Sequence, residues 1–388
     1  MAGILHVGLA LQTPGALPPL WWGPPGMGKT SMTEEMLANL FGWHERDGLE
    51  TLIASQCDPT EFLGLDVPDG TGGTSKAPPE WAKRLATRGS GCLFLDEIGN
   101  APPATQAALL RVVHKRVVGT LALPPGVLIV GASNPPEEAA GGWEQAPAMA
   151  NRWTHLVSLP EDRKPEDWIA WLLKGESAVA TVPQVDLPRW HGEYEVTKKL
   201  TAMFIERRPG ALEEAQKDYR GRVPLAFATR RSWENVVRLH ATCRAVGRED
   251  LLLDFAAGSI GEPMALQYAT WVREIDLPDP KRLLLNPEEF TPDPKRPDRD
   301  YATMLAVVAV ATEGITGRDT EVSRAVRDMW FAAWKVIERG MAAGKELVAG
   351  AAQGLGERRP RGGLTDPSVR GIIAKLAPVL SSAGVRAA

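Results

Sequence analysis

The sequence has little cysteine and no long apolar run. Its three cysteines are odd in number, lie far apart and form no C-x-x-C pair. This usage argues against a disulfide framework and favours a cytoplasmic protein. The six histidines show no metal-ligand spacing. No stretch of 18 or more apolar residues occurs, so no membrane-spanning helix is expected.

Strong charge is also lacking. The formal net charge of −4 argues weakly against non-specific nucleic-acid binding, which needs clustered positive charge, but leaves a local basic groove open. Met1 to Ala10 is apolar yet has no basic residue before it, so we do not expect a secretory signal. With 388 residues, 44% of them hydrophobic, the chain predicts a soluble globular protein of two or three domains.

A glycine-rich stretch, Gly23 to Thr30, fits the phosphate-binding pattern G-x-x-x-x-G-K-[ST]. The apolar segment from Leu17 to Trp22 before it predicts a buried strand. Met32 to Phe41 after it predicts a helix with apolar residues on one face, ended by Gly42. A strand, this loop and a helix in that order are the context that the motif requires.

The residue types of this loop explain how it could bind phosphate. Its glycines let backbone N–H groups converge on a polyphosphate, and the helix N-terminus adds partial positive charge. Lys29 can reach the β- and γ-phosphates, and the Thr30 hydroxyl can bind Mg²⁺. The residues expected to contact ATP here are Gly23, Pro24, Pro25, Gly26, Met27, Gly28, Lys29, Thr30 and Ser31.

Polar residues follow two further apolar strands. Cys92 to Leu95 ends in Asp96, which would hold Mg²⁺, and Glu97, which would act as general base on the attacking water. The strand at Val127 to Val130 is followed by Asn134, a candidate to contact the γ-phosphate or that water. The plain alternatives are a surface acid pair and an asparagine that starts a turn before two prolines.

Other elements of an α/β region surround these motifs. We predict strands at 51–55 and 154–159, and helices at 79–88, 103–117 and 144–151. Asp58 to Glu80 is rich in glycine and proline and predicts a long mobile loop. Arg152 directly follows the last of these helices. It is either a solvated charge or an arginine finger that projects into a neighbouring subunit's site.

Beyond Glu161 the pattern becomes helical, with helices expected at 165–174, 195–206, 229–246, 250–259 and 262–275. Arg231 lies in the first turn of the helix expected at 229–246, where a cation opposes the helix dipole. We therefore expect an anion such as phosphate beside it. Its alternative is a surface pair with Glu234. Six prolines at 277–300 predict a linker or strap. Helices are expected at 301–312, 320–339 and 369–380, with a flexible segment at 340–363.

The order of these motifs resembles the AAA+ ATPases and, within them, the MoxR family. The matching stretches are 23–30, 95–98 with 102–106, 132–135, 151–153 and 229–233. The resemblance implies an α/β P-loop core at 1–160, whose parallel sheet has the strand order 5-1-4-3-2 and helices on both faces. An all-α lid at 161–276, the linker and a helical C-terminal region at 301–388 complete the expected domains.

The same resemblance implies roles for single residues. Asn134 would be sensor 1 and Arg152 the arginine finger. Arg231 would be the sensor 2 arginine of the lid, although Arg230 competes for that role because the motif departs from the usual Ser-Pro-Arg. The loop at 58–80 would face the pore of a ring.

The implied function is ATP hydrolysis with Mg²⁺ by a homo-oligomer, most often a hexamer, that remodels a protein client. The partner would be a protein with a VWA domain. Two other classes stay open: a nucleic-acid motor or defence ATPase of the McrB type, and a nucleotide-gated scaffold. The loop at 58–80 carries one cation, Lys76, which disfavours the motor. Intact Glu97 and Asn134 disfavour the scaffold.

Overall fold

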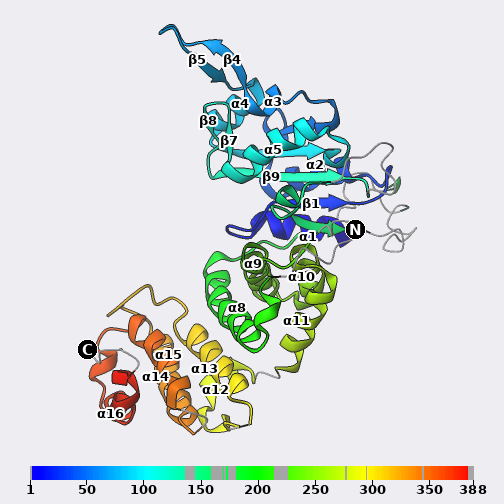
Figure 1. Cartoon of the computed structure of the whole chain (residues 1–388). Helices are drawn as coiled ribbons and strands as arrows, with labels where there is room; N and C mark the ends of the chain where they lie inside the picture. The colour runs from blue at the N-terminus through cyan, green and yellow to red at the C-terminus, as the bar shows by residue number, and fades with distance from the viewer. Residues whose placement is uncertain are drawn as a thin grey trace. The chain divides into compact units, whose positions relative to one another are not determined.

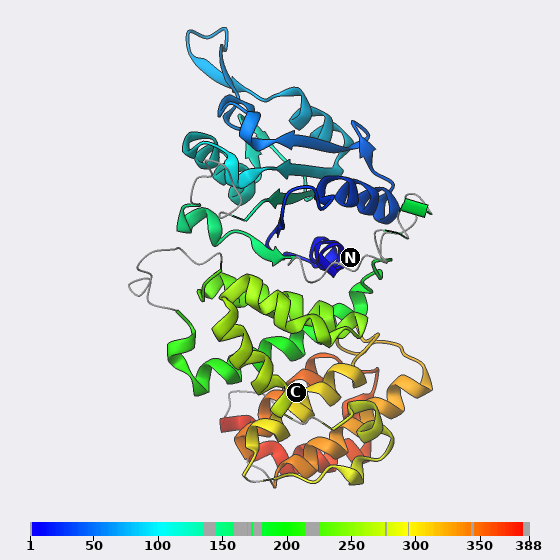
Figure 2. The same ribbon diagram turned by 90° about the vertical axis from the view of Figure 1, so that its right-hand side faces the viewer.

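The chain divides into two compact units, drawn in Figure 1 and Figure 2. The computed structural model describes residues 2–135, 145–158, 169, 172–173, 181–213, 226–275, 278–293, 295–342 and 345–382. Unit 1 comprises Met1–Val185 and Gly210–Gln267, and unit 2 comprises Asp186–Pro209 and Tyr268–Ala388. The domain limits expected from the sequence stay a prediction. No helix in the described ranges is long and apolar enough to cross a bilayer.

The core of unit 1 is a six-stranded sheet in the order β10-β1-β9-β6-β3-β2, in which all neighbouring strands are parallel. Its strands are β1 Pro19–Trp22, β2 His44–Glu45, β3 Gly48–Ile53, β6 Ser90–Asp96, β9 Gly126–Ser133 and β10 Thr154–Val157. Without the two-residue edge strand β2, this is the order 5-1-4-3-2, so the predicted fold class is confirmed.

Helices cover both faces of the sheet, which is why its central strands are apolar throughout. The covering helices are α1 Ala2–Gln12, α2 Lys29–Phe41, α4 Glu80–Arg88, α5 Pro103–Lys115, α6 Pro147–Ala150, α9 Arg230–Val246 and α10 Leu252–Ile260. Successive side chains of a strand point to opposite faces. Trp21 therefore packs into a core with α1, α2 and α9, and Trp22 into the other core with α4 and α5.

The prediction of a long mobile loop between Asp58 and Glu80 is wrong. This stretch forms a short helix, α3 Thr60–Leu63, and an antiparallel hairpin of β4 Leu65–Pro68 and β5 Thr74–Ala77. The Asp69 carboxylate closes the turn by accepting hydrogen bonds from the N–H groups of Thr71 (2.8 Å) and Gly73 (3.0 Å). Figure 1 shows the hairpin projecting from the sheet. A second small hairpin, β7 Val117–Val118 and β8 Leu121–Ala122, follows α5.

Unit 2 is helical. Its helices are α8 Leu187–Arg207, α12 Pro280–Leu285, α13 Pro297–Ala311, α14 Arg324–Gly340, α15 Lys345–Glu357 and α16 Pro367–Ser382, while α11 Glu262–Glu274 begins in unit 1. The expected linker at 277–300 contains α12 instead, and its Leu283, Leu284 and Phe290 are buried in the core of this unit. Apolar residues between the prolines thus override the composition that predicted a linker. The helix expected at 165–174 lies largely outside the described residues.

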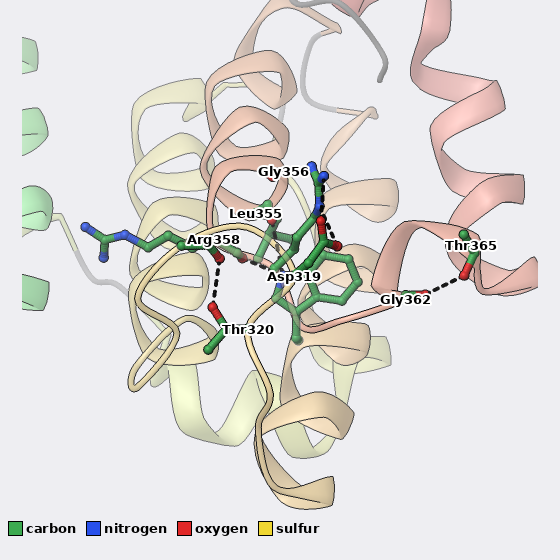
Figure 3. A network of polar contacts seen from close by, with 10 residues as sticks. Asp319, Thr320, Leu355, Gly356, Arg358, Gly362 and Thr365 are labelled. Atoms are coloured by element: carbon green, nitrogen blue, oxygen red, sulfur yellow. Dashed lines mark hydrogen bonds and ion pairs between the residues drawn. The ribbon is translucent and has the colours of Figure 1, made fainter.

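The segment expected to be flexible at 340–363 is also mostly helical. Val348, Ala351 and Leu355 of α15 are fully buried at helical spacing. Figure 3 shows how the end of α15 is held, with Thr320 bonded to the backbone nearby. The Arg359 carbonyl accepts from the Thr320 N–H (3.0 Å), and Trp330 Nε1 donates to the Arg358 carbonyl (2.9 Å). The described residues of this segment are therefore packed into unit 2.

Two buried histidines of unit 1 predict how stability depends on pH. Burial lowers the pKa of His155 to about 4 and that of His240 to about 3. In the unfolded chain both titrate near 6.5, so below that pH only the unfolded chain takes up their protons. Stability is complete above pH 6.5 and is lost as the pH falls. At pH 5 each histidine should lower the free energy of unfolding by about 2 kcal/mol.

Denaturant unfolding of wild type and His240→Gln between pH 7 and pH 5 checks this expectation. The variant should lose less stability over that range than the wild type does. Parallel curves for the two proteins would contradict it.

Candidate nucleotide-binding site

The glycine-rich loop lies between β1 and α2, as the motif requires. Gly28 precedes the first turn of α2 with φ 86°, and Gly26 has φ 73°. These left-handed conformations favour glycine; a Cβ at position 26 would meet nothing within 4 Å, and one at position 28 would meet only the Met32 side chain, at 3.9 Å. The loop therefore leads its backbone N–H groups onto the N-terminus of a 13-residue helix, the geometry of an anion site.

Lys29 is held at the centre of this site and is only 8% exposed. Its ammonium donates to the carbonyls of Gly23 (2.7 Å) and Pro24 (3.1 Å) and to Asn134 Oδ1 (2.8 Å). The predicted lysine and the predicted sensor 1 residue are thus in direct contact, although 105 residues separate them in the chain. The carboxyl ends of β1 and β9, which are neighbours in the sheet, bring them together.

Thr30 and Asp96 also meet. The Thr30 hydroxyl donates to Asp96 Oδ2 (2.6 Å), and Asp96 Oδ1 accepts from the Glu97 N–H (2.8 Å). A hydroxyl beside a carboxylate at a phosphate cradle matches the oxygen ligands that Mg²⁺ uses when most of its shell is phosphate and water. These two residues therefore fit the ion that the sequence predicts. No cluster of three or more metal-ligating side chains occurs in the described ranges.

Glu97 adopts a conformation that side chains rarely take, with φ 56° and ψ 36°. The chain thus turns away from the direction of β6 at Glu97, and the Glu97 carboxylate stands at the end of this strand. Glu97 Oε2 accepts a hydrogen bond from the hydroxyl of Ser55, which follows the end of β3. The sequence reading missed Ser55. Its place just after a strand that neighbours β6 is the signal that could have found it.

Arg152 does not join these residues. β10 runs beside β1 in parallel, with Thr154 opposite Pro19 and Val157 opposite Trp22. Arg152 precedes β10, whereas the glycine-rich loop follows β1. At about 3.3 Å per residue, the four-residue strands separate the two by about 13 Å along the strand direction. Arg152 and the loop of the same chain thus lie at opposite ends of the strands.

Arg231 lies with Arg152 in what we call the basic cluster: His114, Lys115, Arg152 and Arg231. Burial and then the charge of Arg231 lower the pKa of Arg152. Burial and the three other members lower the pKa of His114. Arg152 Nε is buried and has no hydrogen-bond partner in the described ranges. His114 and Lys115, which the sequence reading missed, end a helix that runs back from the carboxyl ends of the strands.

The charged residues close to Arg231 in the sequence form ion pairs with residues other than Arg231. Glu234, its expected surface partner, binds Arg238. Arg230 forms an ion pair with Glu213 (2.9 Å), and its side chain is 75% exposed. Within the described part of the chain, Arg231 thus has no acidic partner, and its charge faces other cations.

The start of α9 is fastened to the segment that carries Arg152. Thr229 caps α9 by accepting from the Ser232 N–H (3.1 Å), and its hydroxyl donates to Asn151 Oδ1 (3.0 Å). Further along α9, the fully buried Asn235 accepts from the Leu17 N–H (2.8 Å) and donates to Thr154 Oγ1 (2.8 Å). The two arginines are therefore presented by one connected piece of unit 1.

The fold and these contacts define a P-loop nucleotide-binding module. Residues 20–152 match the family model described as the AAA domain of the dynein-related subfamily, so this part of the chain is an AAA domain.

Relatives and solved structures match parts of the chain. The Nif-specific regulatory protein of Rhizobium meliloti is 32% identical over 124 residues, which cover 29% of this chain and 22% of that protein. A candidate ATPase from Cytophaga hutchinsonii has a TM-score of 0.40 at 15% identity, covering 72% of this chain and 90% of that one. A full-length MCM homologue from Methanopyrus kandleri has a TM-score of 0.35 at 18% identity, covering 70% and 54%.

Proposed function

We propose that this protein is an ATPase whose active sites are shared between copies of the chain, and that it uses ATP hydrolysis to remodel a protein partner. One observation carries the shared site. The glycine-rich loop from Gly23 to Thr30, with Lys29 at its centre, is called the cradle below. It lies at the opposite end of the strands from the basic cluster, so the arginines of a chain cannot reach the phosphates in its own cradle. The phosphates bound in a neighbouring chain's cradle carry the negative charge that these arginines would fit.

The residues of the cradle have distinct roles in this proposal. Lys29 exchanges the carbonyls of Gly23 and Pro24 for phosphate oxygens, and Asn134 orients the γ-phosphate or the attacking water. Thr30 and Asp96 hold Mg²⁺, which neutralises charge on the phosphates when bound. Glu97 takes the proton of the attacking water once its carboxylate turns from Ser55 toward that water.

For Arg231 we propose a role that differs from the lid role implied by its motif. We infer that it acts together with Arg152 on the neighbour's phosphates, rather than as a lid over its own cradle. Its position beside Arg152 supports this role, as does the lack of an acidic partner in the described part of the chain. Two cations that lie near each other favour an anion between them.

The client is proposed to be a protein. The projecting hairpin β4–β5 carries Asp66 and Asp69, and its cation Lys76 is already paired with Asp66 (2.9 Å). Such a surface disfavours a nucleic-acid backbone. The resemblance to the MoxR family supports a ring, most often a hexamer, that works beside a VWA-domain protein on another protein.

The proposal is tested by steady-state ATP hydrolysis at increasing protein concentration, with and without duplex DNA at several salt concentrations. The rate per chain should rise with concentration as shared sites assemble, and DNA should change it little. A full rate from the dilute monomer would contradict the shared site. Strong stimulation by DNA that fades with salt would favour the nucleic-acid motor instead.

A further inference from the structure

A buried histidine connects the strand before the glycine-rich loop to the segment that presents Arg152. His155 of β10 is 3% exposed and lies between two polar groups. Trp22 Nε1 donates to His155 Nδ1 (2.9 Å), and His155 Nε2 lies 2.9 Å from the carbonyl of Ala150. Since an indole N–H only donates and a carbonyl only accepts, Nε2 must carry the proton. The ring is therefore neutral, and its two nitrogens have fixed, opposite tasks.

Both partners of His155 stand next to groups of the proposed site. Trp22 is the last residue of β1 and precedes Gly23 of the loop. Ala150 is the last residue of α6, two residues before Arg152. α6 has only four residues, too few to be stable by its own hydrogen bonds, so its position depends on tertiary contacts.

We propose that His155 is a positioning residue for Arg152: by binding the Ala150 carbonyl it fixes the end of α6, and so the direction in which Arg152 leaves the chain. The proposal rests on the shared site proposed above. It adds a residue that touches no phosphate and acts only through the arginine that its own chain supplies to a neighbour. The bond between Thr229 and Asn151 holds the same segment from the other side.

Two amide substitutions separate the tasks of the two nitrogens. In His155→Gln, the terminal amide can take the place of Nε2 and still donate to the Ala150 carbonyl. In His155→Asn, the shorter amide can take the place of Nδ1 and still accept from Trp22, but it cannot reach Ala150. Both are polar replacements at one buried position, so thermal denaturation of each serves as the common control for folding.

The test uses mixed assemblies of two inactive chains. A Lys29→Ala chain keeps its arginines but lacks a working cradle, and an Arg152→Ala chain keeps its cradle but lacks the finger. Mixing them should recover ATP hydrolysis at contacts where the first chain serves the second. His155→Asn placed in the Lys29→Ala chain should then lower the recovered rate by about tenfold or more, since losing a finger costs about 10³–10⁵ in kcat.

The same substitution in the Arg152→Ala chain should lower the recovered rate by no more than about twofold, because that chain's finger is already absent. His155→Gln in the Lys29→Ala chain should retain most of the rate. Equal effects of His155→Asn in both chains, or none in either, would overturn the role of His155 while leaving the shared site intact. If the unmodified mixture recovers nothing, the shared site itself is overturned, and the role of His155 with it.

Discussion

Glu97→Gln should still bind ATP but hydrolyse it at least about a hundredfold more slowly than the wild type, because a general base contributes about 10²–10⁴-fold. The substitution replaces one carboxylate oxygen by an amide and keeps the size of the side chain. Glutamine can occupy the left-handed backbone conformation at position 97 as readily as glutamate does. The Thr30–Asp96 contact and the surroundings of Lys29 do not involve the Glu97 carboxylate, so nucleotide affinity should be retained.

Binding of a fluorescent ATP analogue and single-turnover hydrolysis measure the two effects separately. Lys29→Ala is the matched control. It removes the ammonium that, in our proposal, exchanges its hydrogen bonds to backbone carbonyls for contacts with phosphate oxygens, so it should abolish ATP binding itself. Unchanged hydrolysis by Glu97→Gln would show that the attacking water is oriented by another group. Unchanged binding by Lys29→Ala would refute the cradle.

Arg152→Ala should lower kcat by about 10³-fold or more while leaving ATP affinity and the fold of the chain nearly unchanged. Arg152 lies at the other end of the strands from its own cradle, so binding of ATP by that chain should not depend on it. Arg231→Ala should act in the same direction. Its loss removes the second charge of the pair and leaves the first in place.

Arg230→Ala is the control for both substitutions. It is adjacent in the chain and carries the same charge, but it is exposed and paired with Glu213. Its removal should change the rate by less than about twofold, as for a surface ion pair. A large loss with Arg230→Ala and none with Arg231→Ala would assign the sensor 2 role to Arg230, the alternative that the motif leaves open.

The cradle was predictable because each of its parts follows a strand. Local patterns locate the glycine-rich loop, Asp96 and Asn134. The parallel order of the sheet then brings their strand ends together, so Lys29 meets Asn134 and Thr30 meets Asp96. Ser55 escaped because a lone serine after a strand has no pattern, and only the pairing of β3 with β6 sets it against Glu97.

The position of Arg231 could not be read from its motif. It depends on how α9 packs, which Asn235 and the Thr229–Asn151 bond determine through partners more than 70 residues away. Composition was misleading elsewhere for a related reason. Glycine and proline at 58–80 and glycine and alanine at 340–363 suggested loops, but a side-chain-closed turn and a buried apolar face give these stretches regular structure.

The shared site proposed above would give an assembly of this protein a direction. Each proposed contact uses two different surfaces, one from each chain, so successive contacts would point the same way and could not pair off symmetrically. An open row ends with one empty cradle and one idle pair of arginines, and only closure into a ring completes every site. A single chain lacking both functions would then silence two sites, its own and that of the neighbour it serves.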